Sequence, residues 1–323
     1  MDMKKLLLQS MLVTTGVLLV ACAPGNDKKS QEDSSSTKAS TTEVIKDDKQ
    51  LKGVELENTL TNTNWQGTRV YDNENNDLTE ENKEFIGLAK YDAKTNYYEF
   101  FDKETGETRG DEGTFFITND GEKRILISKT KNYQAVVSLT ELTDKIFTYK
   151  REGKDKEGQP IEVFVEHVPY TEKELTFTNG RAEVDSTFAS KLEQKTPGSE
   201  ILGNTLWNGT KVLDEAGNDV TEYNQMFISL AKFDNATSQY EFFDLKTGDS
   251  RGDFGYYDVI NDNTIRTHVS IGENKYGADL ELTELSNERF TYKRQGKDAA
   301  GKEIIIFVEH EPYTGEFKPA FSF

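Results

Sequence analysis

From residue 60 onward, short apolar or alternating runs are separated by turn-forming residues. Runs of this kind, rich in β-branched and aromatic residues, predict β-strands. In the turn at 102–106, Asp102 can bond the turn backbone and Gly106 accepts a positive φ. The expected strands of the first part are 67–71, 85–91, 96–102, 113–118, 123–129, 135–142, 146–151 and 161–167. The pattern therefore predicts an antiparallel meander without a long helix.

This meander occurs twice. Residues 65–70 (Trp-Gln-Gly-Thr-Arg-Val) return as 207–212 (Trp-Asn-Gly-Thr-Lys-Val), at an offset of 142. Residues 147–151 return as 290–294 at an offset of 143, so the second copy has gained one residue, expected in the turn near 267–276. Two long copies are typical of tandem globular domains and not of a solenoid.

Each copy is predicted to be all-β, and the chain to hold two tandem antiparallel small β-barrels. About eight short strands in roughly 110 residues suit a closed barrel, which leaves no exposed sheet edge. A lipocalin-like shape is an analogy, and a β-sandwich is the alternative. The expected domains are 51–178 and 201–323, joined by a linker at 179–200 in which 182–194 has a short helical pattern.

The amino terminus has the features of a bacterial lipoprotein leader. Lys4 and Lys5 precede an apolar run at 6–20, which is too short and interrupted for a comfortable transmembrane helix. The next residues, Ala21 and Cys22, complete Leu-Val-Ala-Cys, which resembles a lipobox. That resemblance implies cleavage between them and acylation of Cys22, the only cysteine. We therefore expect a signal peptide at 1–22 and a lipid-anchored protein on the extracellular face of the membrane, with the bilayer as a partner.

The segment 23–50 is rich in Ser, Thr, Asp and Lys and holds no aromatic residue. Such a composition predicts a disordered tether. The chain has a formal charge of −19, and the leader and tether contribute +1 and −1, so the folded part carries −19. This charge argues against nucleic acid and favours a cationic protein or peptide as partner.

Few residues suggest chemistry. Glu166-His167 and Glu309-His310 look like acid–base pairs, but adjacent residues of a strand point to opposite faces. We expect each histidine on the core face of its strand, and no enzyme motif or cofactor signature is present. Trp65 and Trp207 are expected in the barrel cores, with ligand lining as the alternative.

Two further patterns need weighing. Arg109-Gly110-Asp111 and Arg251-Gly252-Asp253 each follow a Thr-Gly turn and could lie exposed in a hairpin, where they would either bind an adhesion receptor or pair within the hairpin. Acidic residues also cluster in the first turn of each copy: Asp72, Glu74 and Asp77, and Asp214, Glu215 and Asp219. They lack the spacing of a calcium loop, so we expect solvated turns and no metal.

The leader and residues 60–323 together resemble an uncharacterised family of Gram-positive bacterial lipoproteins whose domain has no known function. The resemblance is carried by residues 88–92, 98–102, 109–113 and 149–155. It implies no activity and no catalytic residue. A duplicated, tethered, acidic β domain favours a non-catalytic binding module, in which two copies would add avidity. The alternatives are a small apolar ligand inside a barrel, a signalling peptide released from 16–21, and an enzyme of unknown type.

Overall fold

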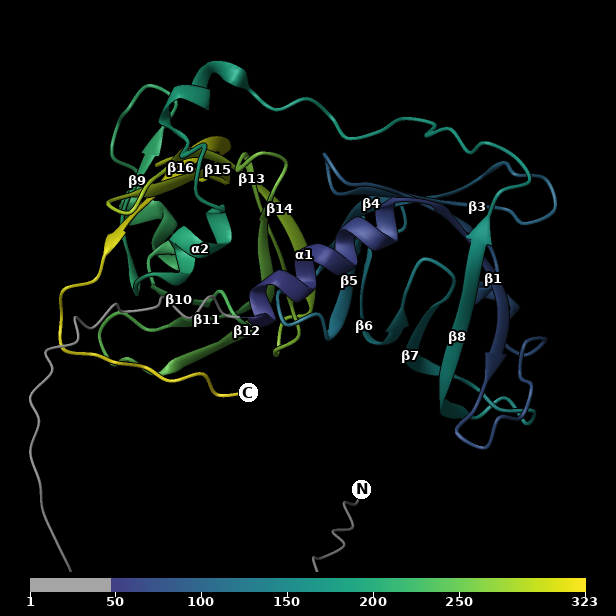
Figure 1. Ribbon diagram of the computed structural model, residues 1–323. Coiled ribbons are helices and arrows are strands. Elements are labelled where there is room, and N and C mark those ends of the chain that lie inside the picture. Colours follow the sequence, from purple (N-terminus) through teal and green to yellow (C-terminus); the bar gives the residue numbers. More distant parts are fainter. Residues whose placement is uncertain (1–47) are drawn as a thin grey trace, which may run out of the picture. The chain divides into compact units, whose positions relative to one another are not determined.

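The computed structural model describes residues 48–323, and both repeats fold as closed barrels of eight antiparallel strands (Figure 1). The predicted signal peptide, its cleavage site at Ala21 and Cys22, and most of the predicted tether lie outside the described residues. The first barrel consists of β1 (Asn64–Tyr71), β2 (Leu88–Asp92), β3 (Tyr97–Phe101), β4 (Thr108–Ile117), β5 (Lys123–Ser128), β6 (Tyr133–Leu142), β7 (Phe147–Lys154) and β8 (Pro160–Tyr170). The second consists of β9 (Trp207–Asp214), β10 (Leu230–Asp234), β11 (Gln239–Phe243), β12 (Ser250–Ile260), β13 (Ile265–Ser270), β14 (Tyr276–Leu285), β15 (Phe290–Lys297) and β16 (Glu303–Pro312).

Each barrel is a meander that closes when its last strand pairs with its first. In the first barrel β8 pairs with β1, and in the second β16 pairs with β9. The predicted barrels are thereby confirmed, and the sandwich alternative is wrong because closure leaves a single continuous sheet in each repeat. The extra residue of the second copy lies where it was expected, since the β5–β6 turn spans 129–132 and the β13–β14 turn spans 271–275.

Some strands of the first barrel, β2 and β4 among them, begin away from their predicted first residues. The predicted strand at 85–91 begins as a 3-10 turn, η1 (Lys83–Phe85), and becomes β2 only at Leu88. The strand predicted at 113–118 starts earlier, at Thr108, and carries a bulge: Phe100 pairs with Asp111 while the next residue, Phe101, pairs with Thr108. A bulge inserts unpaired residues and turns their side chains to new directions. Gly110 within it has φ +61°, which a glycine accepts without strain.

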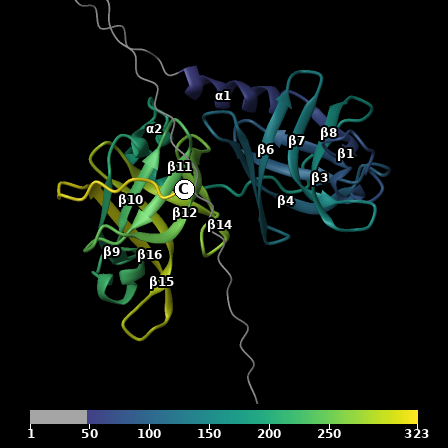
Figure 2. The same cartoon turned by 90° about the horizontal axis from the view of Figure 1, so that it is seen from below.

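A helix before the first strand covers one end of each barrel (Figure 2). The helix α1 (Asp48–Thr61) packs against β2, β4 and β6, and the shorter α2 (Gly198–Gly203) packs against β10 and β12. Trp65 and Trp207 are fully buried at these ends, and their indole N–H groups donate to the backbone oxygens of Leu60 (2.8 Å) and Leu202 (2.9 Å). The helix α1 was not predicted.

The segment after the last strand of each barrel runs back along the outside of the sheet. In the first barrel Lys90 Nζ donates to the backbone oxygen of Leu175 at 2.8 Å, and the Thr178 backbone N–H donates to Glu99 Oε2 at 2.7 Å. In the second barrel Lys232 and Glu241 hold residues 319 and 322 in the same way, at 2.7 Å each. The residues 171–178, which end the predicted first domain, therefore form a strap fixed to the barrel. Farther along, the residues predicted to have a helical pattern contain only a 3-10 turn, η2 (Ser186–Lys191). Within residues 48–323, no helix has the length and apolar character needed to cross a membrane.

Candidate functional site

A cavity of about 440 Å³ lies in the first barrel at the end opposite α1. The β4–β5 turn meets α1, because the Gly53 backbone N–H donates to the Asn119 oxygen at 3.1 Å. The β5–β6 turn, at the other end of β5, contributes Lys131 to the cavity wall. We call this space the first cavity. Its wall combines apolar side chains, namely Phe85, Leu88, Ala89, Phe100, Leu126 and Ala135, with the polar groups described below.

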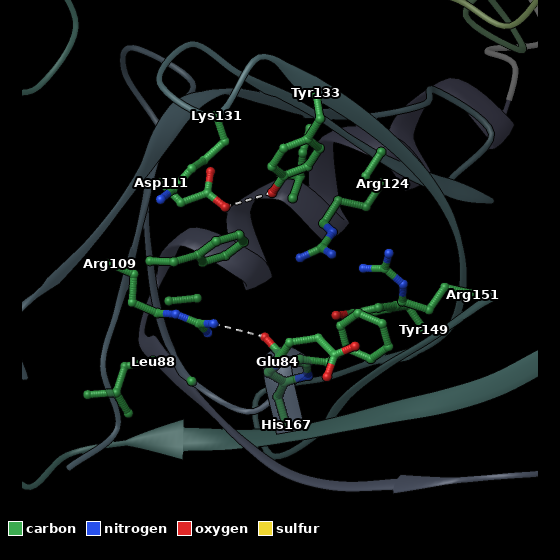
Figure 3. Close-up of a pocket in the computed structure, with 16 residues that line it drawn as sticks. Glu84, Leu88, Arg109, Asp111, Arg124, Lys131, Tyr133, Tyr149, Arg151 and His167 are labelled. Carbon is green, nitrogen blue, oxygen red and sulfur yellow. Dashed lines mark hydrogen bonds between the residues drawn. The ribbon is translucent and has the colours of Figure 1, made fainter. Parts of the chain in front are cut away.

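Arginines from three strands point into the first cavity, as Figure 3 shows: Arg109, Arg124 and Arg151. Arg124 is only 3% exposed, and its Nη1 donates to the hydroxyl of Tyr91 at 2.5 Å. Its guanidinium carbon lies 4.4 Å from the centre of the Tyr149 ring, while that of Arg151 lies 3.9 Å above Phe85. Aromatic faces stabilise such cations but leave their in-plane N–H groups free to bind an acceptor.

Among the described residues, no carboxylate lies within 4.0 Å of any of these three guanidinium groups. Arg109 Nη2 donates to the backbone oxygen of Glu84 at 3.1 Å. The carboxylate of Asp111, also in the wall, is occupied by hydroxyl groups, which come from Tyr98 (3.1 Å), Ser128 (2.9 Å) and Tyr133 (2.8 Å). The cations of the first cavity therefore have no paired counter-charge in this part of the chain.

The wall of the first cavity carries a net charge of the opposite sign to that of the whole chain. Its wall holds four basic residues and two acidic ones, a net charge of +2, whereas the chain carries −19. Cavity walls of low dielectric strengthen the field of such a cluster. An anion in the first cavity would be stabilised there.

The histidine of the first cavity contributes no charge at neutral pH. Burial, with a further contribution from the positive charge of Arg124, lowers the pKa of His167 to about 3. Its ring stacks on Phe147 at 4.9 Å, and the neighbouring Glu166 lies on the other face of β8, as predicted. Burial also raises the pKa of Tyr91 to about 12, so this hydroxyl keeps its proton.

The second barrel repeats the arrangement in a cavity of about 270 Å³, which we call the second cavity. Arg251, Arg266 and Arg294 occupy the positions of the three arginines, and the guanidinium carbon of Arg294 lies 3.9 Å above Phe227. Asp253 accepts hydrogen bonds from two tyrosine hydroxyls, at 2.9 and 2.8 Å. Three basic residues and one acidic residue again give the wall a net charge of +2.

Two histidines line the second cavity. Burial, together with the positive charge of Arg266, lowers the pKa of His310 to about 3, and burial lowers that of His268 well below its usual value. His268 takes the place of Leu126. Both imidazoles are therefore neutral near pH 7.

The structure places the predicted site residues as follows. Arg109, Asp111 and His167 line the first cavity, and Arg251, Asp253 and His310 line the second. The Arg-Gly-Asp tripeptides lie in bulged strands, and among the described residues their Arg and Asp do not pair with each other; each Asp is bound by tyrosines. Trp65 and Trp207 lie at the helix-covered ends and line neither cavity.

In the acidic first turns, the aspartate side chains accept hydrogen bonds from backbone N–H groups of the same turn. Asp72 Oδ1 accepts from the backbone N–H groups of Glu74 and Asn76, both at 2.9 Å, and Asp214 accepts in the same way from Ala216 and Asn218. In residues 48–323 no group of three His, Cys, Asp or Glu side chains is arranged to hold a metal ion.

Sequence reasoning missed two arginines in each cavity, one buried and one half-buried. Arg124 and Arg266 are buried in β5 and β13, at equivalent positions 142 residues apart. Arg151 and Arg294 end the repeated Tyr-Lys-Arg segment. A charged residue retained on the core face of a duplicated strand was the available signal, because such residues are almost never buried without a partner.

The fold defines a tandem eight-stranded β-barrel protein. A model of a domain of unknown function, DUF4822, matches residues 57–177 and 199–321, and the chain belongs to this family. No curated protein matches the chain. Among solved structures, a protein of unknown function from the DUF3598 family of Nostoc punctiforme is similar over 80% of this chain and 98% of its own, at 9% identity and a TM-score of 0.21. A similarity of that size carries no argument about function.

Proposed function

We propose that this chain is a lipid-anchored, non-catalytic binding protein in which each barrel takes a small anionic molecule into its cavity. The observation that carries this proposal is the set of three cavity-facing arginines, without a carboxylate partner among residues 48–323, present in both barrels. A guanidinium group offers paired N–H donors that match a carboxylate or phosphate. Buried charges are retained when something pairs with them, and here a ligand would do so.

The first cavity has the size and wall of a small-molecule site. Ligand pockets typically measure about 300–1,000 Å³ and combine apolar walls with a few placed polar groups. The first cavity, at about 440 Å³, joins the charged groups to an apolar side formed by residues such as Leu88 and Leu126. We infer that its ligand is amphipathic, with an anionic head near Arg124 and an apolar body.

The leader supports the anchored part of the proposal. The only cysteine of the chain, Cys22, follows an apolar run at the position where a lipobox places it. A tethered barrel with an anion site would collect its ligand outside the cell and hold it near the membrane. Capture of a cationic protein remains a second candidate, supported by the net charge of −19; it would use the outer surface, because the cavities are positive.

The test is a calorimetric titration of decanoate and, as an uncharged match, decanol. The protein is the full chain with Cys22→Ser, so that no attached lipid enters the titration. We expect decanoate to bind at least tenfold more tightly than decanol. Arg124→Met should weaken decanoate binding about ten- to hundredfold, because hydrogen bonds to charged groups contribute about 1.5–3 kcal/mol.

Two further variants keep the result interpretable. Arg109→Gln removes an exposed cavity cation without disturbing the core, and it should also weaken binding. Arg289→Met is the matched control, because Arg289 pairs with Glu311 on the second barrel away from both cavities. Equal binding of decanol and decanoate, or a decanoate affinity unchanged by both cavity variants, would refute the proposal.

A further inference from the structure

The two cavities differ by one buried hydroxyl group. In the first barrel the Tyr91 hydroxyl accepts a hydrogen bond from Arg124. In the second, the equivalent residue is Phe233. The two rings have matching surroundings: the Tyr91 ring centre lies 6.4 Å from that of Tyr98, and the Phe233 ring centre lies 6.5 Å from that of Tyr240. The second barrel therefore keeps the aromatic ring at this position and lacks only the hydroxyl group that accepts a hydrogen bond in the first.

The loss of this acceptor leaves Arg266 without a polar partner. Arg266 is 2% exposed, and its guanidinium group makes no hydrogen bond or ion pair with any residue in 48–323. Its guanidinium carbon lies 4.5 Å from the Tyr292 ring centre, which supports the charge but satisfies none of the N–H groups. The ring of Tyr257 packs on Phe233 at 4.6 Å, but its hydroxyl donates to the backbone oxygen of Ser199 and so does not replace the missing acceptor. A buried, unpaired donor is costly, and an entering acceptor removes that cost.

The second cavity is also smaller than the first, and its wall is more polar. Its volume is about 270 Å³ against about 440 Å³. Ser229 and His268 stand where the first barrel has Gly87 and Leu126. The Nδ1 atom of His268 has no partner among the described residues. This wall offers polar contacts in place of the apolar side that suits a decanoate-like tail.

We propose that the second cavity selects a compact, doubly charged oxyanion of the phosphate class, and that the Tyr or Phe at positions 91 and 233 sets this difference. The inference rests on the proposed function and assigns its two sites different ligands. The net wall charge of +2 is the same in both cavities, so the difference lies in the free donors: in the second cavity Arg266 gives its N–H groups to the oxyanion alone, in a smaller and more polar space. In the first cavity Tyr91 already takes one donor of Arg124, which suits a singly charged head.

The experiment exchanges the hydroxyl between the barrels and uses inorganic phosphate as the probe. Calorimetry of the full chain with Cys22→Ser should show one phosphate site, which Arg266→Met abolishes and Arg124→Met leaves intact. Phe233→Tyr should weaken this site about tenfold, because the new hydroxyl engages Arg266. In the Arg266→Met background, Tyr91→Phe should create phosphate binding in the first cavity.

The two titrations distinguish failure of this inference from failure of the proposed function. If decanoate binds as proposed but Phe233→Tyr leaves phosphate affinity unchanged or raises it, the hydroxyl does not set selectivity and the inference is overturned. If decanoate binds and phosphate does not, the inference also falls while the proposed function stands. If neither anion binds, the proposed function itself fails. Both exchanges are between similar rings at equally buried positions, so the variants should fold, and an unchanged near-ultraviolet circular dichroism spectrum checks this.

Discussion

Replacing His167 by Gln is expected to make the first barrel less sensitive to acid. His167 is buried, and its pKa of about 3 in the folded chain compares with about 6.5 for a histidine in an unfolded one. Between these values the unfolded state binds a proton that the folded state does not. Stability is therefore highest above pH 6.5 and falls as the pH drops toward 3.

The size of the effect follows from the pKa difference. Each pH unit below 6.5 costs about 1.4 kcal/mol for one such histidine. Going from pH 7 to pH 5 should therefore lower the free energy of unfolding by about 2 kcal/mol through His167 alone. Burial also raises the pKa of Glu57 to about 8 and that of Asp258 to about 7. Those carboxyl groups have the opposite sign, because their protonation favours the folded state, but they are common to wild type and variant and cancel in the comparison.

The assay is urea unfolding at pH 7 and pH 5, followed by tryptophan fluorescence. Each barrel holds one of the two tryptophans of the chain, so Trp207→Phe in both proteins leaves Trp65 as the reporter of the first barrel. His167→Gln should lose about 2 kcal/mol less than wild type between the two pH values, whatever its stability at pH 7. His310→Gln, in the second barrel, is the matched control and should leave the Trp65 signal unchanged. Equal pH dependence of wild type and His167→Gln would show that His167 is protonated in the folded barrel.

Three other perturbations have defined outcomes. Cys22→Ser should abolish incorporation of radiolabelled fatty acid and release the protein from membranes or leave it unprocessed; normal acylation would contradict the anchor. Asn82→Ala should destabilise the first barrel by about 2–3 kcal/mol in urea unfolding, because fully buried Asn82 exchanges hydrogen bonds of 2.8 Å with the backbone N–H and oxygen of Lys154. Glu99→Ala should free the strap held through Thr178, which limited proteolysis would detect as faster cleavage after residue 171; cleavage at the wild-type rate would mean that the strap is held by other contacts.

The sequence by itself determined the strand-rich class and the duplication, and it favoured a closed barrel over a sandwich. These follow from local signals, since alternation of apolar residues specifies a strand and Gly, Asn or Asp specifies the turn that ends it. The added residue of the second copy could be placed in its turn because the offset changes between 212 and 290. Inward-facing His167 was also predictable, because period-two alternation fixes the face of a strand residue.

Tertiary structure alone decided the helix α1. Its segment has few apolar residues and contains Gly53, so its own helical tendency is weak. It is held by docking: Gly53 lies so close to the backbone of Thr118 and Asn119 that a Cβ atom there would be 2.6 Å from the Thr118 oxygen. No pattern within residues 48–61 reports a contact with residues so far along the chain.

The two cavities were likewise decided by tertiary structure. Arg109, Arg124 and Arg151 come from β4, β5 and β7, and only barrel closure brings them to one space. The bulge before Asp111 turns the Arg-Gly-Asp segment from an expected exposed hairpin into part of the cavity wall. Net charge predicted a preference for cations, but it is a sum over the chain and does not report local sign. Burial removes the screening of water around a few inward-facing cations, so the cavities are positive in an acidic protein.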